Sequence, residues 1–264
     1  MTVHPGSLFS LEGKRAVVTG ASRGIGEAIA RRFAEHGARV VVSSRKIDAC
    51  EEVARSINTA EGREAATAIA CNISDNIQID GLIEETVARL GGVDILVCNA
   101  AVNPYFGPSA EMSEEQFDKI LQCNVKANMR LAHLARPPME AAGAGSIVII
   151  SSIGGMIGSS TLGGYAISKA ADMQIARNLA VEFGPSGIRV NCIAPSVVKT
   201  YFAEALWKDP KIEKAMTEKL PLRRFGEPDD IAGAAVFLAA PSGAWMTGQT
   251  MVIDGGTLAS GGFG

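Results

Sequence analysis

Short apolar runs rich in β-branched residues alternate along the chain with longer stretches of helical period. Most of the runs are almost continuously apolar, which is typical of strands covered on both faces, as in a parallel sheet. They predict seven strands, at 15–19, 39–43, 66–70, 94–98, 146–151, 189–193 and 250–253. Helices are predicted at 24–36, 48–59, 77–90, 113–141, 164–184 and 229–239. This alternation predicts an α/β fold, a doubly wound seven-stranded parallel sheet with helices on both faces, as in a Rossmann fold.

No repeat or charge block interrupts the alternation, and 264 residues fit one α/β domain. We therefore expect a single domain over residues 1–264. The only long irregular stretch, about 196–227, is the natural candidate for a lid over a binding site.

Composition and charge limit which cellular compartment and which classes of binding partner are expected. The formal net charge is -3 and the basic residues are dispersed, which argues against nucleic acid or an anionic membrane as a partner. The cysteines are odd in number and widely spaced, and the histidines lie far apart, which argues against a disulfide framework and a metal site. These residues are Cys50, Cys71, Cys98, Cys123, Cys192, His4, His36 and His133. Residues 1–6 lack a signal-like pattern, no apolar stretch is long enough to span a membrane, and 262–264 form no peroxisomal address, so we expect a cytoplasmic protein.

A glycine-rich loop follows the first predicted strand and runs directly into the first predicted helix. Its sequence, residues 19–26, places Gly20, Gly24 and Gly26 where the backbone must turn sharply and approach a ligand closely. The start of the helix offers free N–H groups to an anion. A glycine-rich turn without a ligand is the alternative, but the position after the first strand favours the pyrophosphate of a dinucleotide.

The end of the second predicted strand indicates which dinucleotide. An acidic residue there would bind the ribose hydroxyls and repel a 2′-phosphate, but the sequence has Ser44 and Arg45. Arg45 offers a planar fork of donors for a phosphate, and Arg23 in the glycine loop adds a second positive charge. NADP(H) is therefore the expected cofactor, the alternative being that Arg45 is an ordinary solvated arginine.

Tyr165 and Lys169 lie four residues apart on one face of a predicted helix. A phenol needs a nearby cation to exchange a proton near neutrality, and Lys169 supplies one. Upstream, Ser152 ends a predicted buried strand, at the sheet edge where open α/β sheets bind ligands. Asn124 is a polar amide among apolar neighbours, and it is either a satisfied core residue or the holder of a water against the lysine.

Taken together, residues 12–256 resemble the short-chain dehydrogenase/reductase family in the order and spacing of the glycine loop, the segment 99–101, Asn124, Ser152, the Tyr165–Lys169 pair and Pro195. Segments 99–104, 124–127, 189–192 and 226–228 look like its NADPH-dependent carbonyl and retinol reductases. The resemblance implies that Tyr165 exchanges the proton, Lys169 lowers its pKa and holds the nicotinamide ribose, Ser152 binds the substrate oxygen, and Asn124 anchors a relay water.

The resemblance also implies a full set of cofactor-binding positions and a homotetramer. The positions are Gly20, Ser22, Arg23, Gly24, Ile25, Gly26, Ser44, Arg45, Asn72, Ile73, Asn99, Tyr165, Lys169, Pro195, Val198 and Thr200. Among them Asn72 and Ile73 would flank the adenine, and Val198 and Thr200 would meet the carboxamide. The subunits would meet through the helix from Gly164, the long helix before it and the last strand.

Two positions depart from the family pattern, because Ala101 and Ser196 stand where glycine is usual, which puts the local backbone in doubt. The expected activity is NADPH-dependent reduction of a ketone or aldehyde. The alternatives are a 3-oxoacyl thioester reductase, an NADP-dependent alcohol dehydrogenase, and an NADPH-binding protein without chemistry, against which the intact catalytic set argues.

The substrate pocket is expected to be apolar, unless several of these side chains serve core or subunit packing instead. Its candidate lining is Val102, Pro104, Tyr105, Phe106, Ile153, Tyr201, Phe202, Leu206 and Trp207. Such a pocket favours small hydrophobic or aromatic carbonyl compounds over sugars or charged keto acids.

Overall fold

The computed structural model describes residues 7–262 and contains one seven-stranded sheet in the order β3-β2-β1-β4-β5-β6-β7, with every pairing parallel. The strands are β1 (Arg15–Thr19), β2 (Arg39–Ser44), β3 (Ala66–Ala70), β4 (Ile95–Cys98), β5 (Gly145–Ile150), β6 (Ile188–Pro195) and β7 (Thr250–Ile253). The predicted Rossmann fold is confirmed, and the predicted strands match these to within two residues at each end. The expectations drawn from residues 1–6 and 263–264 lie outside the described range.

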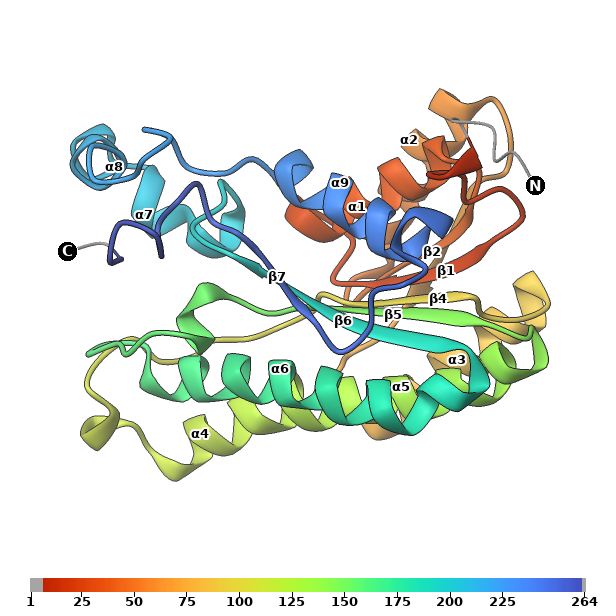
Figure 1. Ribbon diagram of the computed structural model, residues 1–264, viewed down its shortest axis with the longest axis horizontal. Coiled ribbons are helices and arrows are strands. Elements are labelled where there is room, and N and C mark those ends of the chain that lie inside the picture. The colour runs from red at the N-terminus through yellow and green to blue at the C-terminus, as the bar shows by residue number, and fades with distance from the viewer. Residues whose placement is uncertain (1–6, 263–264) are drawn as a thin grey trace.

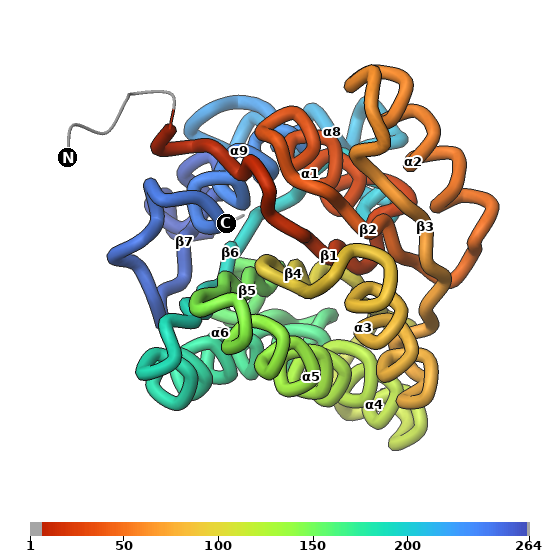
Figure 2. The backbone as a smooth tube through the Cα atoms, turned by 90° about the vertical axis from the view of Figure 1, so that its right-hand side faces the viewer, coloured from red at the N-terminus to blue at the C-terminus, as the bar shows by residue number. Residues whose placement is uncertain are grey.

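Helices cover both faces of the sheet and produce three layers (Figures 1 and 2). One face carries α1 (Gly24–Glu35), α2 (Ile47–Glu61) and α9 (Pro228–Ala239), and the other carries α3 (Asn76–Leu90), α4 (Glu114–Ile120), α5 (Ala127–Ala141) and α6 (Gly163–Phe183). In β1, Ala16 and Val18 pack into the first core and Val17 into the second. Because alternate residues enter different cores, the strands must be apolar at almost every position.

The predicted helix 113–141 is not a uniform α-helix. It begins at a capping box, in which Ser113 Oγ accepts from the Gln116 N–H at 3.2 Å and Gln116 Oε1 accepts from the Ser113 N–H at 3.0 Å. Between α4 and α5 the segment Leu121–Lys126 is π-helical. A π-helical turn changes the direction of the side chains on it, and such turns are frequent at functional sites. This one holds Asn124.

The stretch 196–227 is more regular than the sequence predicts. It contains α7 (Glu204–Trp207) and α8 (Pro210–Thr217), so the expectation of an irregular segment was wrong in this respect. α8 begins where Asp209 caps the Lys211 N–H at 2.8 Å and Pro210 occupies the first helical position. Both helices lie beyond the end of the sheet (Figure 1), where a lid would lie. Within residues 7–262, no helix combines the length and apolarity needed to cross a membrane.

Candidate active site

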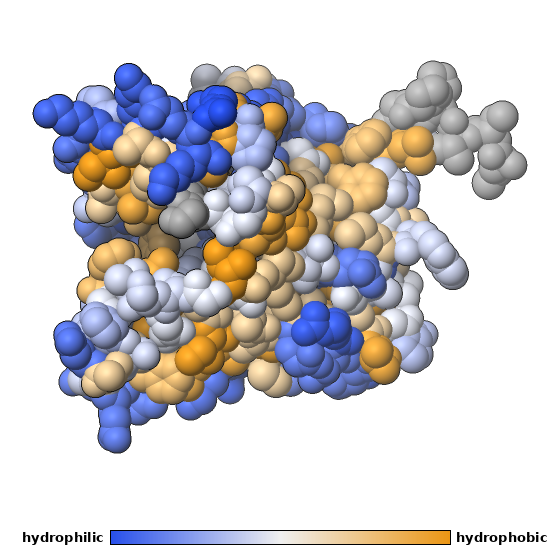
Figure 3. All heavy atoms as spheres, turned by 60° about the vertical axis from the view of Figure 1, so that its left-hand side comes forward, coloured by the Kyte–Doolittle hydropathy of each residue, from blue (hydrophilic) through white to orange (hydrophobic). Residues whose placement is uncertain are grey.

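The carboxyl ends of β1, β4, β5 and β6 meet at the edge of the sheet near α7 and α8 (Figure 1). The chain leaves β1 and β4 in opposite directions at this edge, because β2 and β3 extend the sheet on one side of β1 and β5 to β7 extend it on the other. Ligands of doubly wound sheets bind at such a switch point. From this side the surface is hollowed, with hydrophobic side chains on both sides of the hollow (Figure 3).

The glycine loop lies at this edge and has the geometry of an anion site. Gly20 and Gly24 have left-handed φ angles of 64° and 62°, which glycine adopts without strain. At Gly26 a Cβ atom would lie 2.5 Å from both the Gly20 carbonyl oxygen and Asn99 Nδ2, so only glycine fits there. No side chain caps the start of α1 at Arg23, which leaves the first N–H groups of the helix for a ligand. The loop therefore fits a dinucleotide pyrophosphate.

Asn99 fixes the loop to the end of β4. Its Nδ2 donates to the carbonyl oxygens of Thr19 and Gly20 at 2.9 and 3.1 Å, and its backbone N–H donates to Thr19 Oγ1 at 3.0 Å. The stretch 196–227 reaches the same loop, because the Arg23 guanidinium lies 4.1 Å from the centroid of the Tyr201 ring. Thr200 lies against Gly24, and its carbonyl oxygen accepts from Trp207 Nε1 at 2.9 Å.

The ends of β2 and β3 continue the site away from the loop. The Ser44 carbonyl oxygen accepts from the Cys71 N–H at 2.9 Å, so the residue after β3 lies beside the end of β2. Arg45 is exposed, and Ile73 is buried. Asn72 precedes Ile73, and its Oδ1 accepts from Ser74 Oγ at 3.0 Å. The cofactor positions predicted on different strands thus lie along one edge of the sheet.

Tyr165, Lys169 and Ser152 meet where β5 ends and α6 begins. Lys169 is 2% exposed, and its Nζ lies 5.6 Å from the centroid of the Tyr165 ring. It donates to the Ile150 carbonyl oxygen at 2.9 Å and to Asp172 Oδ2 at 3.0 Å. The Ser152 hydroxyl lies close enough to the Tyr165 phenol to lower its pKa. The phenol, the hydroxyl and the ammonium therefore share one small volume, as the sequence predicts.

Opposing effects act on the two titrating groups. Burial raises the pKa of Tyr165, the Lys169 cation lowers it, the Asp172 carboxylate raises it and the Ser152 hydrogen bond lowers it, with a net rise. Burial lowers the pKa of Lys169, but the charge and the hydrogen bond of Asp172, together with Tyr165 and Cys192, outweigh it, so the net pKa is raised. Near neutral pH the phenol thus holds its proton and the lysine is charged.

Asn124 is completely buried and its side chain is fully bonded. Its Oδ1 accepts from the Val102 N–H at 2.9 Å, and its Nδ2 donates to the Val102 carbonyl oxygen and to Ser168 Oγ, each at 3.0 Å. Of the two readings left open, the side chain has the bonding of a satisfied core residue. A relay water would have to use the backbone carbonyl oxygen, which already accepts from Asn128 Nδ2 at 2.7 Å.

The structure adds one residue that the sequence argument missed. Asp172 lies one turn after Lys169 on α6, is completely buried, and bonds both Lys169 and Asn128. The available signal was an acidic residue within the apolar part of a helix.

The two departures from the family pattern are not strained. Arg223 is the one non-glycine residue with positive φ in the described part of the chain, so Ala101 and Ser196 keep negative φ.

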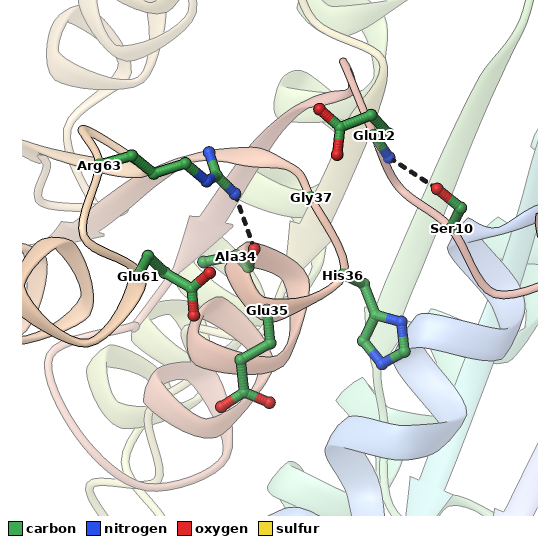
Figure 4. Close-up of a pocket in the computed structure, with 8 residues that line it drawn as sticks. All are labelled: Ser10, Glu12, Ala34, Glu35, His36, Gly37, Glu61 and Arg63. Atoms are coloured by element: carbon green, nitrogen blue, oxygen red, sulfur yellow. Dashed lines mark hydrogen bonds between the residues drawn. The ribbon is translucent and has the colours of Figure 1, made fainter. Parts of the chain in front are cut away.

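Other features of the described residues do not compete with this site. All five cysteines are buried free thiols, and within residues 7–262 no three His, Cys, Asp or Glu side chains form a metal cluster. A hollow near the end of α1 holds Glu12, Glu35, His36 and Glu61, whose polar ends diverge (Figure 4). Arg63 there donates to the Ala34 carbonyl oxygen at 2.8 Å. This hollow lies away from the carboxyl edge of the sheet.

A glycine loop that fits a pyrophosphate, next to a Tyr–Lys–Ser cluster at a switch point, defines a nucleotide-dependent oxidoreductase. A family model described as enoyl-(acyl carrier protein) reductase matches residues 20–257. Dehydrogenase/reductase SDR family member 4 of Sus scrofa is 45% identical over 248 residues, which cover 94% of this chain and 88% of the relative. The chain belongs to the short-chain dehydrogenase/reductase family, and it is an oxidoreductase that acts on the CH–OH or C=O group.

Solved structures agree over nearly the whole chain. Gluconate 5-dehydrogenase from Burkholderia cenocepacia, in complex with NADP and tartrate, superposes with a TM-score of 0.91 at 30% identity, covering 97% of this chain and 99% of that one. A 7α-hydroxysteroid dehydrogenase complexed with NADH and 7-oxo glycochenodeoxycholic acid has a TM-score of 0.91 at 37% identity, covering 96% and 98%. The fold thus serves both cofactors and very different substrates.

Proposed function

We propose that the protein reduces a ketone or aldehyde to an alcohol with NADPH, and that Tyr165 donates the proton. The observation that carries this proposal is the cluster of Tyr165, Lys169 and Ser152 beside the glycine loop. When bound, the dinucleotide supplies the hydride that adds to the carbonyl carbon. Ser152 and Tyr165 hydrogen-bond the carbonyl oxygen, and as negative charge develops there the O–H bond of Tyr165 breaks and the alcohol O–H bond forms.

Lys169 holds its charge where it stabilises this transfer. An ammonium has three donors, of which Ile150 and Asp172 take two. The third is free to hold a ribose hydroxyl, the role that the family resemblance implies. The net rise in the pKa of Tyr165 keeps the phenol protonated near neutral pH, which supports proton donation, and hence reduction, over proton abstraction from an alcohol.

NADPH is the proposed cofactor because β2 ends without a carboxylate. Ser44 and the exposed Arg45 take that place, and Arg23 lies nearby in the glycine loop. A guanidinium can bind a 2′-phosphate through two parallel hydrogen bonds. Asn72 and Ile73 would flank the adenine, and Pro195, Val198 and Thr200 would border the nicotinamide half. The NADP bound to gluconate 5-dehydrogenase supports this choice.

The proposed substrates are small hydrophobic or aromatic carbonyl compounds. The Phe202 ring lies 6.0 Å from the Tyr165 ring, centroid to centroid, and is 59% exposed. Phe106 and Tyr201 are also large exposed side chains of the predicted lining. Covering such rings with an apolar substrate stabilises the complex, and the rings offer few hydrogen-bond partners to a sugar.

A cytoplasmic homotetramer is the proposed assembly. On α6 Val181 is 81% and Ile167 is 53% exposed, on α5 Met129 is 39% exposed, and on β7 Val252 is 38% exposed. These are the elements through which the family resemblance implies subunit contact. An unpartnered apolar surface of this kind is typical of an isologous interface.

The test is to follow NADPH oxidation with a panel of aldehydes, ketones, α-dicarbonyls and 3-oxoacyl thioesters. We expect the apolar ketones and aldehydes to have the highest kcat/KM, with Tyr165→Phe as the inactive control. A clear preference for the thioesters would favour the 3-oxoacyl reductase alternative. Faster alcohol oxidation than carbonyl reduction at neutral pH would favour the dehydrogenase alternative. Nucleotide binding without any turnover would indicate a binding protein.

A further inference from the structure

A buried hydrogen-bonded chain lies behind the Tyr165–Lys169 pair. Asp172 is 0% exposed, its Oδ2 accepts from Lys169 Nζ at 3.0 Å, and its Oδ1 accepts from Asn128 Nδ2 at 2.9 Å. The same Asn128 amide donates to the Asn124 carbonyl oxygen at 2.7 Å. The chain thus links α6 to the π-helical segment through side chains that are all buried.

Burying a carboxylate is expensive unless its charge is matched and its oxygens are bonded. Asp172 meets both conditions, but only through Lys169 and Asn128. Lys169 in turn has the Ile150 carbonyl oxygen as its other protein acceptor. Two fixed acceptors hold the ammonium against the Tyr165 ring, and one of them is the carboxylate of Asp172. Burial raises the pKa of this carboxyl, and the charge of Lys169 and the hydrogen bonds from Lys169 and Asn128 lower it, with a net rise.

We propose that Asp172 is a positioning residue of this active site, which fixes Lys169 and cancels part of its charge so that Tyr165 remains a proton donor to higher pH. The inference rests on the proposed function for its catalytic meaning. It does not follow from the Tyr–Lys–Ser cluster itself, which needs no carboxylate at this position.

The charges around the cluster determine in which direction the pKa of Tyr165 changes when Asp172 is replaced. Tyr165 and Lys169 lie on α6 with Asp172, and the thiols of Cys98 on β4 and Cys192 on β6 also face the pair. Burial raises the pKa of both thiols, so they stay neutral. The fixed charges are therefore one cation, which lowers the pKa of Tyr165, and one anion, which raises it. Removing only the anion must lower that pKa.

The test is Asp172→Asn, which keeps the shape and removes the charge. The protein has three tyrosines, so Tyr105→Phe with Tyr201→Phe leaves Tyr165 as the only one, and ultraviolet absorbance reports its ionisation directly. In this background we expect Asp172→Asn to lower the titration midpoint by about one pH unit, equal to about tenfold more tyrosinate at a given lower pH. In this variant the Ile150 carbonyl oxygen still accepts from Lys169 Nζ, so the lysine keeps one fixed protein acceptor.

With the tyrosines restored, the alkaline limb of kcat/KM for carbonyl reduction should move down by a similar amount. The matched control is Asp94→Asn, which breaks the Arg15–Asp94 ion pair of 2.6 Å far from the site. We expect it to lower the unfolding temperature without moving the tyrosine midpoint. A midpoint that stays unchanged or rises in Asp172→Asn overturns the proposal.

The absorbance titration needs no substrate, so it gives its result even where no carbonyl compound is turned over. That outcome would refute the proposed function alone. Should Asp172→Asn fail to fold by circular dichroism, Asp172→Ser replaces it. This variant also removes the negative charge, and we expect a shift in the same direction. An unchanged midpoint there would overturn the proposal.

Discussion

Arg45→Ala tests the choice of cofactor most directly. Arg45 follows β2, is exposed, and forms no side-chain hydrogen bond or ion pair among the contacts found in residues 7–262. Its replacement therefore removes little from the fold. The 2′-phosphate is the only part of NADPH that NADH lacks, so a residue that binds this group must affect one cofactor and spare the other.

The expected size follows from the exposure of the side chain. A charged hydrogen bond contributes about 1.5–3 kcal/mol, and the lower value applies where solvent screens the contact. A loss of about 1.5 kcal/mol corresponds to roughly a tenfold fall in kcat/KM for NADPH. The value for NADH should stay within about twofold, and the parent preference for NADPH should shrink as salt increases.

The assay compares initial rates with NADPH and NADH on one carbonyl substrate, with Arg39→Ala as the matched control. Arg39 is an exposed arginine at the other end of the same strand, about 20 Å away at the rise of a β-strand. It removes the same charge but should leave both cofactors unaffected. Equal efficiency of the two cofactors in the parent protein, or equal losses with both in Arg45→Ala, would refute the reasoning.

Three further predictions concern chemistry, lid and assembly. Tyr165→Phe removes the proton donor, so turnover should fall by about a hundredfold to ten-thousandfold while NADPH binding, measured by fluorescence titration, persists; near-normal turnover would contradict the mechanism. Trp207→Ala removes the bond to the Thr200 carbonyl oxygen and an apolar surface of the proposed lid, so KM should rise more for bulky apolar ketones than for acetone, and equal changes would argue against this pocket. Light scattering should give a tetramer for the parent and smaller species for Val181→Glu, and a monomeric parent would refute the proposed interface.

The strands and the location of the site could be predicted from the sequence, because both depend on local signals. β1 must be apolar on both faces, and Gly20, Gly24 and Gly26 occupy positions that side chains cannot enter. Parallel strands bring their carboxyl ends to one edge, so residues that follow different strands meet there whatever their distance in sequence. Fold and pocket location were therefore accessible from the sequence.

The details that escaped prediction depend on distant partners or on short elements. No glycine marks the π-helical segment, whose Asn124 is held by Val102 from another part of the chain. In sequence Asp172 is an acidic residue among apolar helical neighbours, but the partners that make its burial tolerable, Asn128 on α5 and Lys169, are set by the fold. Within the stretch 196–227, α7 is four residues long, too short to establish a helical period.

Because all five cysteines are buried, a single introduced cysteine can be labelled selectively to follow the stretch 196–227. Burial raises the pKa of each thiol, to about 11 at Cys71, so little thiolate exists at neutral pH to react with a maleimide dye. A cysteine introduced at the exposed Lys211 on α8 would therefore be labelled selectively in the otherwise unaltered protein. A fluorophore there would show in real time whether the stretch 196–227 moves when a ligand binds, with every native thiol left in place.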